Sequence, residues 1–292
     1  MHEAVGYQDA TMQPPSTPAP EAPAFQTIRV SVEGPLGRLT LARPERLNTM
    51  TSLMLQELAQ AAHWFDEHRQ LRVVIVSGEG RMFTAGADLR DAPSLPALPG
   101  AGNTWIYRRE AGQYGLRMAD AIEQMRAVTI AQVHGYSVGG GIVLMAACDL
   151  RVVAQDTVMF IPEVDLGIPL AWGGIPRLVR EIGPALTKEL VMTCRRFCPD
   201  EAKAIGFVNR VVPAGEVAAA AEALAAEVIA KPSVPVAITK EHVMAITRTM
   251  GAGNTSFADG DGLLAALADP ECLSAGYSYL ESRLSKKQSP RD

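Results

Sequence analysis

The sequence lacks the features that mark membrane, secreted or nucleic-acid-binding proteins. It has no run of about eighteen apolar residues, so no membrane-spanning helix is expected. Acids and prolines occupy the N-terminus in place of a basic start and an apolar segment, and we expect no secretory signal. A net charge of −5 gives no electrostatic reason to bind nucleic acid or an anionic membrane surface. Any bound anion must therefore be held by a local arrangement of groups.

Cysteine is scarce, and its spacing does not indicate a metal site. Cys194 and Cys198 are separated by three residues, but no second cysteine pair or histidine cluster completes a zinc site. The same holds for Cys148 and Cys272, which stand alone in the chain. We therefore expect four free thiols, no bound metal and a reducing, cytoplasmic location.

The chain divides by composition into three parts. Residues 11–24 hold five prolines and almost no large apolar side chain, which predicts a disordered tail over residues 1–24. Residues 25–215 alternate strand and helix patterns, which is typical of an α/β core. The strand patterns stop at about Glu216, so residues 216–292 are expected to form a helical C-terminal region.

Apolar patterning places the elements of the expected core. The stretch RVVIVSG at 72–78 is a continuous apolar run that ends in glycine, which predicts a strand buried on both faces. The stretch 51–68 has apolar residues near helical spacing. Other strands are expected within FQTIRVSVEG, RLTLAR, VTIAQVHG, LRVVAQ, TVMFIP and FVNRVV. A Pro/Gly-rich loop is expected at 91–103, before a helix that starts near Asn103.

One stretch, HGYSVGGG at 134–141, supports three interpretations. GYSVG matches the Gly-x-Ser-x-Gly pattern of serine hydrolases, which would make Ser137 a nucleophile on a strand-to-helix turn. That mechanism needs a downstream histidine, and the only one is His242, which lies inside a helical pattern. Alternatively, the glycines only permit close helix packing. In the third interpretation they expose backbone N–H groups at the positive end of a helix, which suits a developing oxyanion.

A second glycine-containing turn favours the oxyanion interpretation. FTAGADL at 83–89 directly follows the buried strand. With ARPERLNTMT at 42–51, PEVDLGIP at 162–169 and AKAIGFVNRVV at 202–212, these motifs resemble the crotonase superfamily of enoyl-CoA hydratases and isomerases, from about Phe25 to Arg283. The resemblance implies a crotonase-like ββα spiral core with a helical C-terminal oligomerisation region. It also makes Ser137 a bystander in a turn.

The resemblance implies an acyl-CoA thioester as substrate and assigns residues to it. The N–H groups of Ala87 and Gly140 would polarise the thioester carbonyl and stabilise its enolate. CoA is part of the substrate, so no separate cofactor is expected. The backbone that cradles the CoA would come from Arg46, Leu47, Ala85, Asp88 and Leu89, with Gly139 and Val143 also at the substrate. Asp88 has an alternative role as the cap of a helix beginning at DLRD.

The carboxylates depart from the hydratase pattern. Hydratases of this family carry two glutamates, and the positions that match them hold Val143 and Glu163. Apolar neighbours should raise the pKa of Glu163 to a range useful for acid–base catalysis. A single carboxylate suffices to move a proton between C2 and C4 of an enoyl-CoA, so isomerisation is favoured over hydration. Asp165 is an alternative second acid, or a turn residue, and Glu163 itself could be a surface residue at a strand end.

Other expectations concern assembly and competing functions. The resemblance implies a homotrimer or hexamer, and Ser282 with Arg283 stands where some members offer a lysine to the nucleotide. The segment LGIPLAWGG at 166–174 resembles decarboxylases of the family, so decarboxylation remains an alternative. A non-catalytic acyl-CoA-binding protein is another, because Val143 removes half of the hydratase machinery.

Overall fold

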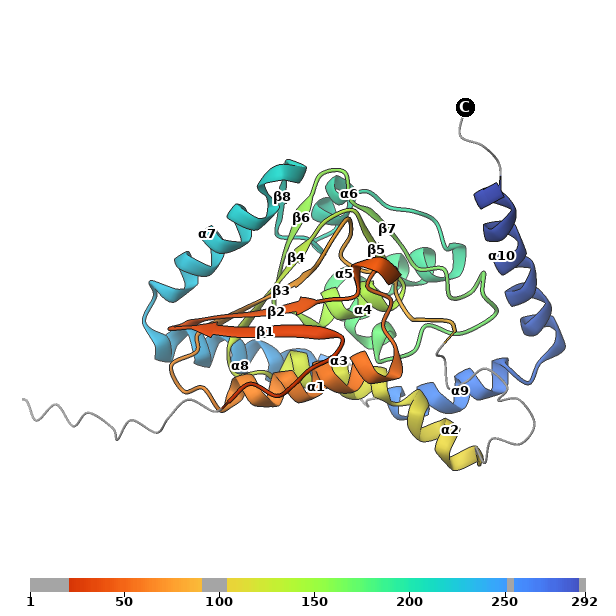
Figure 1. The fold of residues 1–292 in the computed structure, drawn as a ribbon, viewed down its shortest axis with the longest axis horizontal. Helices are drawn as coiled ribbons and strands as arrows, with labels where there is room; N and C mark the ends of the chain where they lie inside the picture. The colour runs from red at the N-terminus through yellow and green to blue at the C-terminus, as the bar shows by residue number, and fades with distance from the viewer. Residues whose placement is uncertain (1–20, 91–103, 251–254, 289–292) are drawn as a thin grey trace, which may run out of the picture.

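A computed structural model describes residues 21–90, 104–250 and 255–288 (Figure 1). Its main sheet has six strands in the spatial order β1-β2-β3-β4-β6-β8. These strands are β1 (Ile28–Glu33), β2 (Leu36–Leu41), β3 (Val73–Gly78), β4 (Val128–Val133), β6 (Leu150–Ala154) and β8 (Arg210–Val212). β1 and β2 pair antiparallel, and every later pair in this sheet is parallel. The order confirms the expected α/β core.

A small second sheet sits beside the main one. It pairs β5 (Tyr136–Val138) with β7 (Val158–Phe160) in parallel, with Ser137 opposite Met159. The chain thus runs from a main-sheet strand to a short strand and then to a helix, first as β4-β5-α4 and again as β6-β7-α5. This repeat is the ββα spiral that the resemblance implied. It also corrects one expectation, because Ser137 lies in strand β5 and not in a turn.

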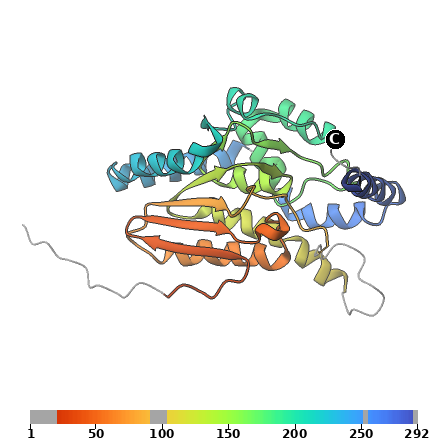
Figure 2. The ribbon, with the colours of Figure 1, turned by 45° about the horizontal axis from the view of Figure 1, so that its top comes forward.

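Helices cover both faces of the main sheet. The α-helices are α1 (Ser52–Asp66), α2 (Trp105–Gly112), α3 (Tyr114–Gln124), α4 (Gly140–Ala147), α5 (Gly174–Thr193), α6 (Pro199–Ala204), α7 (Val217–Ile229), α8 (Ser233–Met250), α9 (Asp259–Ala266) and α10 (Pro270–Gln288). Short 3-10 helices are η1 (Pro44–Arg46), η2 (Ala214–Glu216) and η3 (Thr255–Ala258). Both ribbon views place α10 on the opposite side of the molecule from α7 (Figures 1 and 2).

Strand β3 carries the core on both of its faces, as its uninterrupted apolar run predicts. Val74 and Val76 pack in the large core with α1, α3 and α4. Val73 and Ile75 point the other way, into a second core that α7 closes. The domain boundary expected at 215/216 stays a prediction, but α7 directly after it packs against the sheet. The sheet is therefore covered in part by the segment expected to form the C-terminal region.

The expected N-terminal tail and the expected 91–103 loop lie mostly or entirely outside the described ranges. Most of the expected tail, residues 1–20, and the loop at 91–103 lie outside the described residues. Residues 21–24 have no regular secondary structure, and Trp64 Nε1 donates a hydrogen bond to the Glu21 carbonyl. Within the described ranges, the helices are too short or too polar to cross a membrane.

Candidate functional site

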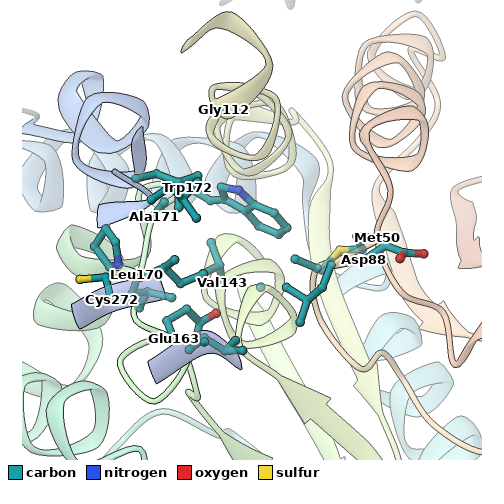
Figure 3. A pocket seen from close by; sticks show the side chains of 18 of the residues that line it. Met50, Asp88, Gly112, Val143, Glu163, Leu170, Ala171, Trp172 and Cys272 are labelled. Carbon is teal, nitrogen blue, oxygen red and sulfur yellow. The ribbon is translucent and has the colours of Figure 1, made fainter. Parts of the chain in front are cut away.

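A cavity of about 200 Å³ opens between the spiral core and the C-terminal helices (Figure 3). Its walls come from the two glycine turns, the Glu163–Trp172 segment, the C-terminal end of α2 and helices α9 and α10. The described residues that line it are Met50, Ser52, Leu55, Ala87, Asp88, Leu89, Ala111, Gly112, Gly140, Val143, Glu163, Leu166, Ile168, Pro169, Leu170, Ala171, Trp172, Leu263, Leu267, Cys272, Leu273, Gly276, Tyr277 and Leu280. The lining is predominantly apolar, as ligand sites usually are.

A buried asparagine holds the first turn in place. Asn48 has a left-handed backbone (φ 51°) and is fully buried. Its Nδ2 donates to the carbonyls of Glu79, Met82 and Phe83 at 2.8, 3.0 and 3.1 Å, and its Oδ1 accepts from the Arg43 N–H at 2.9 Å. These bonds tie the η1 segment to the chain that leads into FTAGADL.

The backbone around Ala87 leaves one N–H facing the cavity side. The Met50 N–H donates to Gly86 O at 2.8 Å, and the Met50 carbonyl accepts the Asp88 N–H at 2.9 Å. Neighbouring peptide groups in an extended chain point in opposite directions, so the Ala87 N–H points away from Met50. It donates to no acceptor within the part of the chain that the structure describes. The turn therefore offers a free donor at the predicted position.

The second turn supplies another donor beside the first. Gly139 caps α4 with φ 51°, and Gly140 is the first residue of that helix. The N–H of a first helical residue has no intrahelical acceptor, and Gly140 N finds none among the described residues either. A Cβ on Gly86 would lie 3.6 Å from Gly140 N. The two turns are thus adjacent, and both Ala87 and Gly140 line the cavity.

Glu163 places a buried carboxylate in this cavity. Its backbone carbonyl accepts the N–H groups of Leu166 at 3.0 Å and Ile168 at 2.9 Å, which fixes the turn after β7. A Cβ on Gly139 would overlap the Oε1 atom and lie 3.0 Å from Cδ, so the carboxylate packs directly on that glycine. Oε2 is buried and has no hydrogen-bond partner among the described residues. Burial raises the pKa of Glu163 from 4.5 to about 7.

Val143 shares the cavity with Glu163, whereas Asp165 does not. Val143 lies one turn into α4, is fully buried and lines the cavity, and Figure 3 shows it close to the Glu163 carboxylate. Asp165 is exposed in the turn after Glu163, and its N–H approaches Cys194 Sγ at 3.4 Å. It is therefore a turn residue, which excludes its use as the second acid. The surface position considered for Glu163 is wrong as well.

Only some of the residues expected to cradle CoA line the cavity. Asp88 and Leu89 line the cavity, whereas Arg46, Leu47 and Ala85 lie outside its lining. Arg46 is exposed at the end of η1, and Leu47 O accepts the Ala85 N–H at 3.0 Å, so that N–H is already engaged. Gly139 is also outside the lining and serves as the seat of the Glu163 carboxylate.

Asp88 is held as a carboxylate by its neighbours. Burial opposes its ionisation, but hydrogen bonds from Thr49 Oγ1 at 2.9 Å, Arg90 N at 3.2 Å and Arg43 Nη1 at 3.3 Å outweigh it and lower its pKa. Leu89 and Arg90 form a turn, so the first residues of the helix that Asp88 was expected to cap are not helical, and the rest of that prediction falls outside the described residues.

The structure does not assemble a serine hydrolase site. Ser137 is fully buried, and its Oγ has no hydrogen-bond partner within the described ranges. His242 is exposed on α8, and neither residue lines the cavity. The hydrolase hypothesis required these two side chains to meet, so the geometry rules it out. Ser282 is exposed on α10, where its Oγ donates to Tyr279 O at 2.7 Å.

Part of the site could not be placed from the sequence. Trp172 and the lining residues of α9 and α10 were missed, although LGIPLAWGG was noted for its resemblance to decarboxylases. Gly276 of α10 packs against the Glu163 turn, where a Cβ would lie 2.9 Å from Leu166 O. Gly276 stands in the run SAGYS, whose other small residues left no distinct signal for this contact. No cluster of three metal-ligating side chains occurs in the described parts of the chain.

Fold and site together define a protein of the ββα spiral type, with two adjacent free backbone donors and a buried acid in an apolar cavity. The chain belongs to the enoyl-CoA hydratase/isomerase family, whose model matches residues 32–284. It is 36% identical over 233 residues to the human mitochondrial Delta(3,5)-Delta(2,4)-dienoyl-CoA isomerase, covering 77% of this chain and 71% of the relative. It is 32% identical over 221 residues to a probable mitochondrial enoyl-CoA hydratase of Dictyostelium discoideum, covering 76% of each.

Solved structures agree with this assignment. An enoyl-CoA hydratase structure from Geobacillus kaustophilus matches with a TM-score of 0.69 and 28% identity, over 92% of this chain and 98% of that one. An enoyl-CoA hydratase/isomerase from Mycobacterium paratuberculosis matches with a TM-score of 0.77 at 24% identity, over 87% and 99% of the two chains, which supports the fold. The chain is thus an enzyme of this family with isomerase or hydratase activity.

Proposed function

We propose that the protein isomerises 3-enoyl-CoA to 2-enoyl-CoA, with Glu163 as the acid–base residue. The observation that carries this is the buried Glu163 carboxylate in the cavity, with its pKa raised to about 7 and Val143 where a second acid would stand. The other carboxylate among the described lining residues, Asp88, is engaged by Arg43 and Thr49. Relatives named as isomerases at 36% identity support the same choice.

The reaction needs one group that takes a proton and returns it. In the proposed mechanism the ionised Glu163 removes a proton from C2 of the 3-enoyl thioester. The electron pair of that C–H bond moves onto the thioester oxygen, giving a conjugated dienolate. The dienolate then takes the proton from Glu163 at C4, and the double bond comes to lie between C2 and C3. A pKa near the working pH lets one carboxyl perform both transfers.

The two free N–H groups have a role in the same mechanism. Negative charge gathers on the thioester oxygen in the dienolate, and the N–H groups of Ala87 and Gly140 would donate to it. One preorganised donor of this kind is worth roughly 3–4 kcal/mol of transition-state stabilisation. In this proposal the CoA belongs to the substrate, and no further cofactor takes part.

Hydration is disfavoured by the missing second acid. Water addition needs a water molecule held and deprotonated while a proton reaches C2. Val143 offers no acceptor for such a water, and Asp165 lies outside the cavity. Decarboxylation is disfavoured too, since no arginine, lysine or histidine is among the described lining residues to bind a substrate carboxylate.

The test is to measure consumption of a 3-enoyl-CoA and of a 2-enoyl-CoA by the purified protein. We expect conversion of the 3-enoyl substrate and little water addition. Glu163→Gln should lower isomerisation by at least 10²-fold while keeping acyl-CoA binding. Asp165→Asn, an exposed carboxylate two residues away, is the matched control and should leave the rate unchanged. Equal measurable rates for Glu163→Gln and wild type would show that Glu163 is not the acid–base residue. Binding of acyl-CoA by wild type without any conversion would leave only the non-catalytic binding function.

The trimeric or hexameric assembly and the cytoplasmic location remain predictions. The named relatives include mitochondrial and peroxisomal proteins. All four cysteines are free, in agreement with a reducing compartment.

A further inference from the structure

The indole ring of Trp172 forms a wall of the cavity next to the second glycine turn. A Cβ on Gly140 would overlap the ring atom Cζ3 and lie 2.9 Å from Cε3 and Cη2, so the six-membered ring rests on the Gly140 backbone. A Cβ on Gly115 of α3 would overlap Cγ, Cδ1 and Cδ2, so the five-membered ring packs on that glycine. The indole therefore fits between two helices only because both positions lack a side chain.

The backbone of Trp172 is held in an unusual conformation. Its φ of 61° lies in the left-handed region, which is uncommon for a bulky residue and persists only where the surroundings enforce it. Asp259 Oδ2 of α9 accepts the Gly173 N–H at 2.7 Å. Arg177 Nη1 donates to the carbonyls of Trp172 and Gly173 at 3.4 and 3.2 Å.

Ion pairs of the buried Arg177 in turn fix these anchoring groups. Arg177 is buried and its Nη2 pairs with two acids of α3, Asp120 at 2.7 Å and Glu123 at 2.8 Å. The indole is thus clamped on both sides, by the ring contacts and by the backbone. A wall fixed in this way cannot swing aside to accommodate a bulkier ligand.

We propose that Trp172 determines acyl-chain specificity by excluding substrates that are branched at C2. The inference rests on the proposed function, in which the thioester oxygen binds at Gly140 N–H. The ring touches that same residue, so it faces the acyl carbons nearest the thioester (Figure 3). A methyl branch at C2 would meet the indole, whereas an unbranched chain extends past it toward α9 and α10.

Binding of saturated acyl-CoAs tests this inference without relying on turnover. Calorimetry compares hexanoyl-CoA with 2-methylhexanoyl-CoA. We expect wild type to bind the branched ligand about 10–100-fold more weakly, the usual range for one misfitted methyl group. Trp172→Leu should reduce that ratio to within about threefold. Trp105→Leu is the matched control, because Trp105 on α2 is exposed and outside the cavity lining, and its ratio should equal that of wild type.

A second variant probes the position of the ring if Trp172→Leu fails to fold. Gly115→Ala places a methyl group against the indole and should push it toward the cavity, weakening binding of both ligands severalfold. Gly215→Ala is the matched control, because a Cβ there would have nothing within 4 Å, and it should leave binding unchanged. An equal effect of the two alanines would overturn the placement of the indole.

The outcomes separate the two proposals. If wild type binds both ligands equally, the specificity inference is wrong, whatever the reaction. If wild type discriminates between them but does not convert a 3-enoyl-CoA, the inference stands and the isomerase proposal fails. Failure of wild type to bind either ligand would overturn both.

Discussion

Replacing Glu163 by glutamine should make the protein progressively more stable relative to wild type as the pH rises. Burial raises the pKa of Glu163 from 4.5 to about 7 in the folded protein. The folded state therefore keeps a proton that the unfolded chain releases near pH 4.5. Between these pKa values the folded state binds more protons, so rising pH lowers the free energy of unfolding of wild type. Glutamine carries no such proton and removes this dependence.

The magnitude follows from the two pKa values. At about 1.4 kcal/mol per pKa unit, ionising Glu163 in the folded protein costs about 3 kcal/mol. This destabilisation of wild type is fully present above about pH 8 and absent below about pH 4.5. The buried amide of glutamine adds a cost of about 1–3 kcal/mol if it finds no partner, but that cost does not vary with pH. The informative quantity is therefore the change with pH in the stability difference between variant and wild type.

Urea unfolding of both proteins from pH 5 to pH 8.5, at one fixed protein concentration, measures this change. We expect the difference to grow by about 2–3 kcal/mol over that range, mostly between pH 5 and 7.5. Asp165→Asn serves as control, because it removes an exposed carboxylate that lies outside the cavity. A difference that stays constant would show that Glu163 ionises normally, and the acid–base argument for it would then be wrong.

Four further results are expected. The kcat/KM of isomerisation should rise through about pH 7 and level off above it, because the carboxylate is the form that removes the C2 proton; a pH-rate profile measures this. Val143→Glu should raise water addition to a 2-enoyl-CoA by about 10²-fold, the low end for a positioned base, while losing about 1–3 kcal/mol of stability. A folded variant that binds substrate without gaining hydration would refute the placement of Val143. Ser137→Ala should keep activity within a few-fold in the same assay, and a loss of several orders of magnitude would contradict the bystander role. Calorimetry should find that enoyl-CoA thioesters bind far more tightly than the free enoic acids.

Much of the core could be predicted because its physical causes are local. The apolar run within 72–78 can bury all of its apolar side chains only in a strand covered on both faces, and β3 is such a strand. The glycines at 139–141 mark a helix start whose own residues carry no side chains, and α4 begins at Gly140. The apolar environment of Glu163 could be predicted as well, since Leu166 and Ile168, which follow it in the sequence, line the same cavity.

The remainder of the site depends on long-range packing that no local pattern records. Nothing in the sequence near Trp172 shows that its ring fits between Gly115 and Gly140, because three separate segments must meet to form that slot. β5 was missed since three residues of strand look like a turn when their partner β7 is unknown. The contribution of α9 and α10 was missed for the same reason, as both were read only as assembly helices.

The order of these segments along the chain has a consequence for how the protein is made. Ala87, Gly140 and Glu163 leave the ribosome more than a hundred residues before Gly276, which packs over the turn that holds the carboxylate. Domains generally fold as units during synthesis. The cavity takes its lining residues from Met50 to Leu280, so it cannot close around Glu163 until α10 has been made. Until then the oxyanion donors and the acid lack part of the wall that separates them from water.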